Sequence, residues 1–259
     1  IQNEPDWSPE YDGCEWSGAQ ILDFIKNYGD KIKAKVLAAE AVNFQTKYTD
    51  PVLNDPVAVN NLDIVGGHLY GGGLRDYPLA REKGKEIWMT EHLLNDEKDN
   101  YGLGWDQALV VAKELHDCME ANFSAYFWWY LKRSYSMLGD GELGTIEGQI
   151  MKRGYVMSHY AKYAAGKQRV AVSKINNNAN ILITAYSGQD DITLVLINNG
   201  TTAVGGLKIN IPVEAKSCEA VQTSTNENMF NLNTSLDADK KSASIELPAQ
   251  TIVSIRFGI

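Results

Sequence analysis

LDIVGGHLYG, residues 62–71, places a continuous apolar run directly before two polar ring side chains, His68 and Tyr70. A run without alternation is typical of a strand that is buried on both faces of a parallel sheet. Three further stretches have the same form: KAKVLAAEA (33–41), KEIWMTEH (85–92) and SAYFWWYLKRS (124–134). Together they predict a sheet of parallel strands in the first part of the chain.

Helical periodicity fills the spaces around these strands. Three segments have the period of amphipathic helices: SGAQILDFIKNYGDKI (17–32), GWDQALVVAKELHDCMEANF (104–123) and KRGYVMSHYAKYAAG (152–166). Ser17 is a candidate N-cap, and Gly166 is a typical C-cap residue. The first segment carries its apolar side chains on one face: Ile21, Phe24, Ile25 and Tyr28. Strands that alternate with helices predict βα units.

From about residue 167 the chain changes to short, alternating, β-branched strands with turns at NNNAN (176–180) and NNGTT (198–202). This pattern predicts an antiparallel, sandwich-like β domain. The expected strands are KQRVAVSKI, NILITAYSG, DITLVLINNG, GGLKINIPV, CEAVQTS, SASIELPAQ and TIVSIRF. We expect two domains, residues 1–166 and 167–259, and a tight boundary, because no low-complexity linker separates them.

Composition excludes several classes of function. The net charge of −9 disfavours nucleic acid or an anionic membrane as a partner, because both require a basic face. No apolar run reaches the roughly 18 residues of a membrane span. Cys14, Cys118 and Cys218 are too far apart for a zinc motif and predict no disulfide framework. Six Trp and thirteen Tyr fit either a carbohydrate binder or an aromatic core.

Polar side chains collect at the predicted strand ends, where a (β/α) barrel builds its catalytic site. They are Asn3, Glu4, Glu40, His68, Tyr70, Glu91, Trp128, Trp129 and Tyr130. Two glutamates surrounded by aromatic rings suit glycoside hydrolysis, which needs one protonated and one ionised carboxyl group. Each residue also has an ordinary interpretation: a solvated rim glutamate, a structural histidine, or tryptophans in a barrel core. Glu40 fits either a hydrogen-bonding support or a rim residue.

Five stretches together resemble the bacterial xylanases of glycoside hydrolase family 30, in clan A. They are IQNEPDW (1–7), LNDPVAVNNLDIVGGHLYG (53–71), EIWMTEH (86–92), AYFWWYLKRSY (125–135) and MKRGYVMSHYAKY (151–163). The resemblance also reaches LPAQTIVSI (247–255) in the β domain. It implies a TIM-type (β/α)8 barrel, present here from about the fourth strand onward, with an appended antiparallel β-sandwich side domain.

The resemblance also implies a reaction, the retaining hydrolysis of β-1,4-xylan by an extracellular enzyme without metal or cofactor. Glu4 would be the general acid/base and Glu91 the nucleophile. The implied substrate-binding residues are Asn3, Trp7, His68, Tyr70, Trp128, Tyr130, Arg133 and Arg153. The two arginines are candidates for binding a glucuronic acid branch, because a carboxylate suits a guanidinium. The acidic residues Asp140, Glu142 and Glu147 between them would oppose a uronate, so dependence on the branch stays open.

Two alternatives are another retaining clan A hydrolase, such as a glucosylceramidase-like or β-1,6-glucanase enzyme, and a non-catalytic carbohydrate-binding fragment. A barrel that begins at its fourth strand cannot close. We therefore expect a preceding segment or a second chain to complete it.

The resemblance leads to four expectations about the site. The Glu4 and Glu91 carboxyl groups should lie about 5 Å apart, as retention requires. Tyr70 should donate a hydrogen bond to Glu91, and His68 should lie on the same face. The pKa of Glu4 should be raised and that of Glu91 lowered. One of Trp128 and Trp129 should stack on the sugar while the other packs into the barrel wall.

Overall fold

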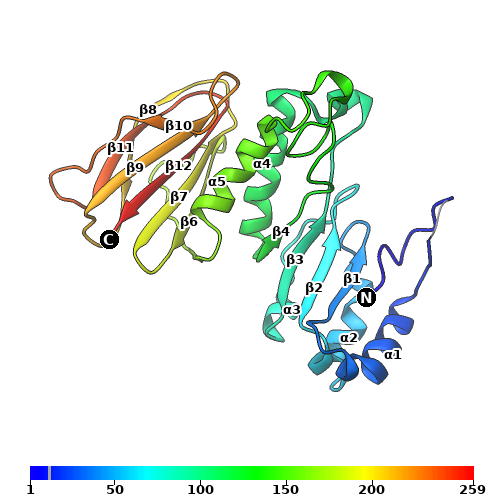
Figure 1. Cartoon of the computed structure of the whole chain (residues 1–259). Coiled ribbons are helices and arrows are strands. Elements are labelled where there is room, and N and C mark those ends of the chain that lie inside the picture. Colours follow the sequence, from blue (N-terminus) through cyan, green and yellow to red (C-terminus); the bar gives the residue numbers. More distant parts are fainter. Residues whose placement is uncertain (11–12) are drawn as a thin grey trace. The chain divides into compact units, whose positions relative to one another are not determined.

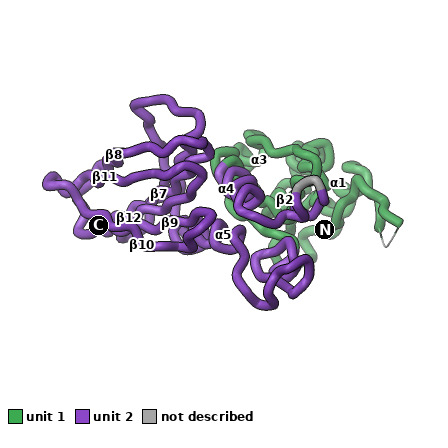
Figure 2. Tube along the Cα trace, turned by 90° about the horizontal axis from the view of Figure 1, so that it is seen from above, with its two compact units in different colours: residues 1–93, 117–129 green, residues 94–116, 130–259 purple. Residues whose placement is uncertain are grey.

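The computed structural model describes residues 1–10 and 13–259. The chain divides into two compact units, shown in green and purple in Figure 2. Unit 1 comprises residues 1–93 and 117–129, and unit 2 comprises residues 94–116 and 130–259. These units do not test the predicted domain boundary at residue 166, so that boundary stays a prediction.

Unit 1 contains a parallel sheet with the strand order β1-β2-β3-β4 (Figure 1). Its strands are β1 (Leu37–Ala41), β2 (Ile64–His68), β3 (Glu86–Glu91) and β4 (Ala125–Tyr126). The predicted strands are present, but each is shorter than its apolar stretch. β4 differs most, since the chain leaves the sheet after Tyr126 instead of continuing to residue 134. All four carboxyl ends meet at one edge, because the pairs are parallel.

Helices cover this sheet and close a core with it. They are α1 (Gly18–Tyr28), α2 (Asp50–Asn54) and α3 (Pro78–Glu82), with 3₁₀ segments Gly29–Lys31, Thr46–Tyr48 and Ala58–Asn61. Ser17 caps α1 as predicted, in a capping box with Gln20. Ile21 and Ile25 are fully buried, whereas Tyr28 is 51% exposed. The expectation that Tyr28 lies on the buried face is therefore wrong; its ring instead lies against Phe24 and the Lys31 ammonium.

Two longer helices follow, α4 (Gly104–Glu120) and α5 (Lys152–Tyr163). The 3₁₀ segments Glu97–Gly102 and Glu142–Gly144 precede them. α5 ends at a cap on Ala164, and Gly166 lies beyond it with φ of +76°. The predicted C-cap glycine thus serves the turn after the helix rather than the cap itself. In the part of the chain that the structure describes, no helix has the length and apolarity of a membrane span.

The rest of unit 2 is an antiparallel β-sandwich (Figure 1). One sheet has the order β10-β9-β12-β7-β6-β5, and the other pairs β11 with β8. Side chains from both sheets share one apolar core, as the alternating pattern predicts. The strands are β5 (Gln168–Val170), β6 (Ile181–Ser187), β7 (Asp191–Asn198), β8 (Val204–Asn210), β9 (Ser217–Thr223), β10 (Phe230–Leu232), β11 (Ser242–Leu247) and β12 (Thr251–Gly258). The sequence analysis did not foresee β10.

Candidate active site

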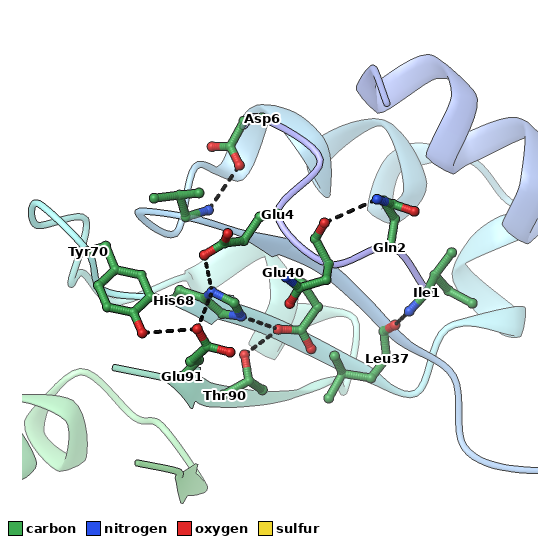
Figure 3. A network of polar contacts seen from close by, with 12 residues as sticks. Ile1, Gln2, Glu4, Asp6, Leu37, Glu40, His68, Tyr70, Thr90 and Glu91 are labelled. Atoms are coloured by element: carbon green, nitrogen blue, oxygen red, sulfur yellow. Dashed lines mark hydrogen bonds and ion pairs between the residues drawn. The ribbon is translucent and has the colours of Figure 1, made fainter. Parts of the chain in front are cut away.

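Glu4, His68 and Glu91 converge at the carboxyl edge of the unit 1 sheet (Figure 3). His68 ends β2 and Glu91 ends β3, and the two are register partners in the parallel pair. Glu4 lies in the segment before α1 and reaches His68 with Oε1, which is 2.9 Å from Nδ1. His68 Nδ1 also lies 3.8 Å from Glu91 Oε1. One imidazole therefore lies between two carboxylates from distant parts of the chain.

Tyr70 and Glu40 extend this cluster on either side (Figure 3). The Tyr70 hydroxyl donates a 2.9 Å hydrogen bond to Glu91 Oε1, as predicted. Glu40 Oε2 lies 3.1 Å from His68 Nε2 and accepts a short hydrogen bond from the Thr90 hydroxyl. Both ring nitrogens of His68 thus face carboxylate oxygens. His68 lies on the same face as Tyr70, as predicted, with ring centroids 5.9 Å apart.

The backbone around Glu4 and Glu40 is bent to produce this arrangement. Both have positive φ, 45° for Glu4 and 61° for Glu40, a region that non-glycine residues seldom occupy. The Glu40 carbonyl accepts a 3.0 Å hydrogen bond from the Glu4 amide, so each bend supports the other. The Asp6 carboxylate accepts from the Val42 amide at 3.0 Å and fixes the same segment to the end of β1. Strained residues of this kind concentrate at functional sites.

Gly66 in β2 provides the room for the Glu40 carboxylate. A Cβ at this position would lie 2.9 Å from Glu40 Oε1 and 2.5 Å from the Leu37 side chain. The neighbouring Gly67 allows the Phe44 ring to approach in the same way, since a Cβ there would lie 2.4 Å from it. Gly66 therefore makes room at the site, whereas Gly67 makes room for the Phe44 ring in the apolar core.

Burial and charge shift two of the site's pKa values. Burial raises the pKa of Glu91, and this outweighs the lowering by the His68 charge and the Tyr70 hydrogen bond. Burial lowers the pKa of His68, but the hydrogen bond to Glu40 and the Glu91 and Glu4 carboxylates raise it above its ordinary value of 6.5. The expectation that Glu91 is held at a low pKa is therefore wrong. Two donors do not compensate for desolvation beside two other acids.

The spacing of Glu4 and Glu91 has a direct chemical meaning. One oxygen of each, with the His68 nitrogen, lies within 4.8 Å of the others. The same spacing would also admit a divalent ion, but a ligating imidazole needs an unprotonated nitrogen toward the metal. Here both His68 nitrogens are at hydrogen-bond distance from carboxylates. We therefore interpret the cluster as a hydrogen-bonded pair of acids.

Four predicted aromatic or amide residues of unit 1 differ in exposure. Trp128 is half-buried, and its ring meets His92 edge-on at 5.9 Å; His92 in turn contacts Tyr70. Trp129 is 39% exposed, so it is not the one that packs into a wall. The exposures fit the assignment in which Trp128 is the more enclosed ring, and stacking of Trp129 on the sugar stays a prediction. Two further predicted binding residues are exposed: Asn3 and Trp7.

The other predicted binding residues belong to unit 2. Arg133 lies over the Tyr130 ring, 5.1 Å from its centroid. Arg153, at the start of α5, is only 3% exposed, and its Nη2 donates to the Ser134 carbonyl at 3.2 Å. Among the residues that the structure describes, its Nη1 and the Ser136 hydroxyl are buried and have no hydrogen-bond partner. Burial lowers the pKa of Arg153 to about 10. Arg153 is therefore a buried side chain and not part of a surface ion pair.

Sequence reasoning left Glu40 undecided and passed over Thr90 and Asp6. Thr90 directly precedes Glu91, and its side chain points toward Glu40 (Figure 3). The position of Glu40 at a strand end was the available signal. The contacts of Glu40 depend on its positive φ and on the space at Gly66. The periodicity of the sequence reveals neither feature.

Comparison with known proteins identifies the relatives of this chain. It is 35% identical to the glucuronoxylanase XynC of Bacillus subtilis over 98% of its own length. The solved family 30 subfamily 8 xylanase of Clostridium acetobutylicum superposes with a TM-score of 0.89, at 33% identity and over 100% of this chain. The resemblance to bacterial xylanases of glycoside hydrolase family 30 is confirmed. No family model matches the chain.

The family 30 structures also confirm the predicted fold class. The parallel sheet belongs to a TIM-type barrel, and the antiparallel sandwich is its side domain. A family 30 endoxylanase of Clostridium papyrosolvens agrees, with a TM-score of 0.87 at 32% identity over 100% of this chain and 64% of its own length. The chain spans 59% of the Bacillus subtilis relative and 65% of the Clostridium acetobutylicum structure.

Proposed function

We propose that this chain carries the two catalytic glutamates of a retaining endo-β-1,4-xylanase that acts on extracellular polysaccharide. One observation carries the proposal: Glu4 and Glu91 offer carboxylate oxygens within 4.8 Å of each other at the carboxyl edge of a parallel sheet. Retaining glycosidases keep their two carboxyl groups about 5–5.5 Å apart, whereas inverting enzymes leave roughly 6.5–9.5 Å for a water molecule. The proximity favours retention.

In the first step, Glu4 donates its proton to the glycosidic oxygen while a Glu91 oxygen attacks the anomeric carbon. The bond between that carbon and the leaving oxygen breaks, and a glycosyl ester on Glu91 forms. Tyr70 already engages Oε1 of Glu91, so we assign the attack to Oε2. The Tyr70 hydrogen bond orients the nucleophile and stabilises its charge.

In the second step, water attacks the same carbon and the Glu4 carboxylate takes its proton. The ester bond breaks, and Glu91 returns as a carboxylate. His68 holds Glu4 through Oε1, so the proton that moves resides on Oε2. Both steps use Oε2 of Glu4 and Oε2 of Glu91. These two atoms must keep their positions through the cycle, which agrees with the hydrogen-bonded backbone around Glu4.

Recognition of a glucuronic acid branch is the finer part of the proposal. The Bacillus subtilis relative carries the name glucuronoxylanase. In unit 2, Arg153 holds a buried Nη1 without a hydrogen-bond partner, and the Ser136 hydroxyl is in the same state. A buried guanidinium that is left partly unsatisfied is costly, and a carboxylate would satisfy it. We assign Arg153 to uronate binding, with Arg133 and Tyr130 as the neighbouring stacked pair.

The test compares Glu4→Gln and Glu91→Gln with the unaltered protein on glucuronoxylan, unbranched xylan, β-1,6-glucan and activated aryl xylosides. We expect Glu91→Gln to be inactive on every substrate. Glu4→Gln should lose about 10²–10⁴-fold on xylan and less on aryl xylosides, whose leaving groups need no acid. Cleavage of β-1,6-glucan in place of xylan would favour the other clan A hydrolases. Xylan binding without turnover would favour the binding fragment.

A further inference from the structure

Glu40 has no part in the double displacement, yet it is one of the most firmly held acids in the site. Its side chain is 15% exposed, and its Oε2 contacts His68 Nε2 and the Thr90 hydroxyl. Gly66 leaves space for the Glu40 carboxylate, and the Glu40 carbonyl accepts a hydrogen bond from the Glu4 amide. A rim glutamate would need none of these contacts.

The two carboxylates around His68 limit its protonation state. Nδ1 lies 2.9 Å from Glu4 Oε1, and Nε2 lies 3.1 Å from Glu40 Oε2. A neutral imidazole has one N–H, so it would turn a lone pair toward one of these two carboxyl oxygens. An imidazolium donates to both. The groups that face His68 are the carboxylates of Glu4, Glu40 and Glu91 and the Tyr70 ring, and none of them is cationic.

We propose that Glu40 is a positioning residue that keeps His68 as an imidazolium, with Nδ1–H directed at Glu4. The raised pKa of His68 agrees with this assignment. The hydrogen-bonded Glu40 and His68 place a fixed positive charge between Glu4, Glu40 and Glu91. Without this charge, two ionised glutamates in a buried site would be costly. His68 keeps both protons through the cycle, and only Glu4 exchanges its proton with the leaving group and with water.

The pair would affect both steps of the reaction. When Glu4 releases its proton, the carboxylate that forms lies beside a donor that is already in place, so little reorganisation is needed. The same charge helps to keep Glu91 ionised against its burial. These kinetic effects rest on the proposed function, whereas the protonation of His68 does not.

The first test is a pH titration of ¹⁵N-histidine-labelled protein by NMR, in which a His68→Gln variant identifies the His68 signals. In the unaltered protein we expect both ring nitrogens to be protonated at pH 6.5 and above. Glu40→Gln should lower the His68 midpoint by about one pH unit or more, because an opposite charge shifts a pKa by roughly 1–3 units. Glu40→Asp keeps the charge and should restore most of the midpoint.

Glu86→Gln is the matched control, since Glu86 is a glutamate of the same sheet, at the start of β3, that pairs with Lys35 and Trp88. It should leave the His68 titration unchanged. The proposal is overturned if His68 is neutral at pH 6.5 in the unaltered protein, or if Glu40→Gln leaves its midpoint in place. Circular dichroism of each variant separates these outcomes from unfolding.

A kinetic arm then tests the consequence for Glu91. In Glu40→Gln the acid limb of kcat/KM should move to higher pH by about one unit, because Glu91 loses the imidazolium but stays buried. We expect kcat to fall more than KM changes. An unmoved acid limb would show that Glu40 acts only structurally. If the unaltered protein shows no turnover, the proposed function fails, and the NMR titration still decides the role of Glu40.

Discussion

Glu4 and Glu91 share one imidazole, with His68 Nδ1 lying 2.9 Å from Glu4 Oε1 and 3.8 Å from Glu91 Oε1. The two acids nevertheless have different surroundings. Glu4 is buried and contacts His68 Nδ1, whereas Glu91 is partly buried and accepts a hydrogen bond from the Tyr70 hydroxyl. Two carboxyl groups in unequal environments can take unequal roles, one as proton donor and one as nucleophile.

The raised pKa of Glu91 predicts an effect on stability. A group whose folded pKa lies above its unfolded value contributes stability at low pH, and that contribution is lost as the pH rises through the folded pKa. At neutral pH the ionised Glu91 therefore weakens the fold. Glu91→Gln should raise the free energy of unfolding by about 1 kcal/mol at pH 7. The gain should be smaller at pH 4.

Calorimetry at the two pH values measures this difference. A lower Tm for Glu91→Gln at pH 7 would mean that the carboxylate is stabilised by its donors, contrary to the burial argument. The activity should also show an acid limb above the ordinary glutamate range, and that limb belongs to the interacting pair of carboxyl groups.

Tyr70→Phe should reduce kcat by about 10–100-fold, because a hydrogen bond to a charged group contributes about 1.5–3 kcal/mol. The ring stays, so the edge contacts with His68 and His92 are retained. Tyr77→Phe is the matched control, since Tyr77 is a buried tyrosine of the same unit that bonds Asp50 and Thr49. It should lower Tm with little effect on kcat. Equal kinetic losses in both variants would contradict the role of Tyr70.

The tryptophan pair can be separated by alanine substitution. Trp128 is half-buried against His92, which contacts Tyr70, whereas Trp129 is 39% exposed. We expect Trp129→Ala to lower kcat/KM on xylan with only a modest change in Tm, and Trp128→Ala to lower Tm. Binding and thermal melts of both variants measure the effect. A large loss of Tm in Trp129→Ala with normal kinetics in the remaining folded protein would contradict this assignment.

Arg153→Gln tests branch recognition. It removes the guanidinium but keeps a donor for the Ser134 carbonyl. We expect kcat/KM on glucuronoxylan to fall by about tenfold or more, the equivalent of one charged hydrogen bond. Activity on unbranched xylan should change little. Arg133→Gln, which removes the cation over the Tyr130 ring and beside Tyr135, gives the comparison. Equal loss on both substrates would refute uronate binding by Arg153.

The sequence predicts the strands of the sheet because their apolar runs are required by burial on two faces. It does not predict where they end. The stretch 124–134 is apolar enough for one long strand, but only Ala125 and Tyr126 pair with β3. Most of the aromatic residues that follow are apolar but exposed. The periodicity of a sequence does not distinguish exposed apolar residues from core residues.

The sequence predicts which residues form the site better than it predicts their pKa values. Strand ends bring His68, Glu91 and Tyr70 together, since parallel strands share an edge. The pKa of Glu91 was predicted in the wrong direction, because burial depends on how Glu4 and Glu40 crowd the same space. That crowding comes from the bent backbone at Glu40, a feature of tertiary structure alone.

Trapping the glycosyl intermediate tests the central claim most directly. The protein would be incubated with a 2-deoxy-2-fluoro-xylobiosyl fluoride, which slows the second step more than the first, then digested and analysed by mass spectrometry. We expect one fluoroxylobiosyl group per chain, attached to the peptide that contains Glu91 and absent from Glu91→Gln. A label on Glu4 or Glu40, or hydrolysis of xylan with no label and inverted anomeric configuration, would contradict it.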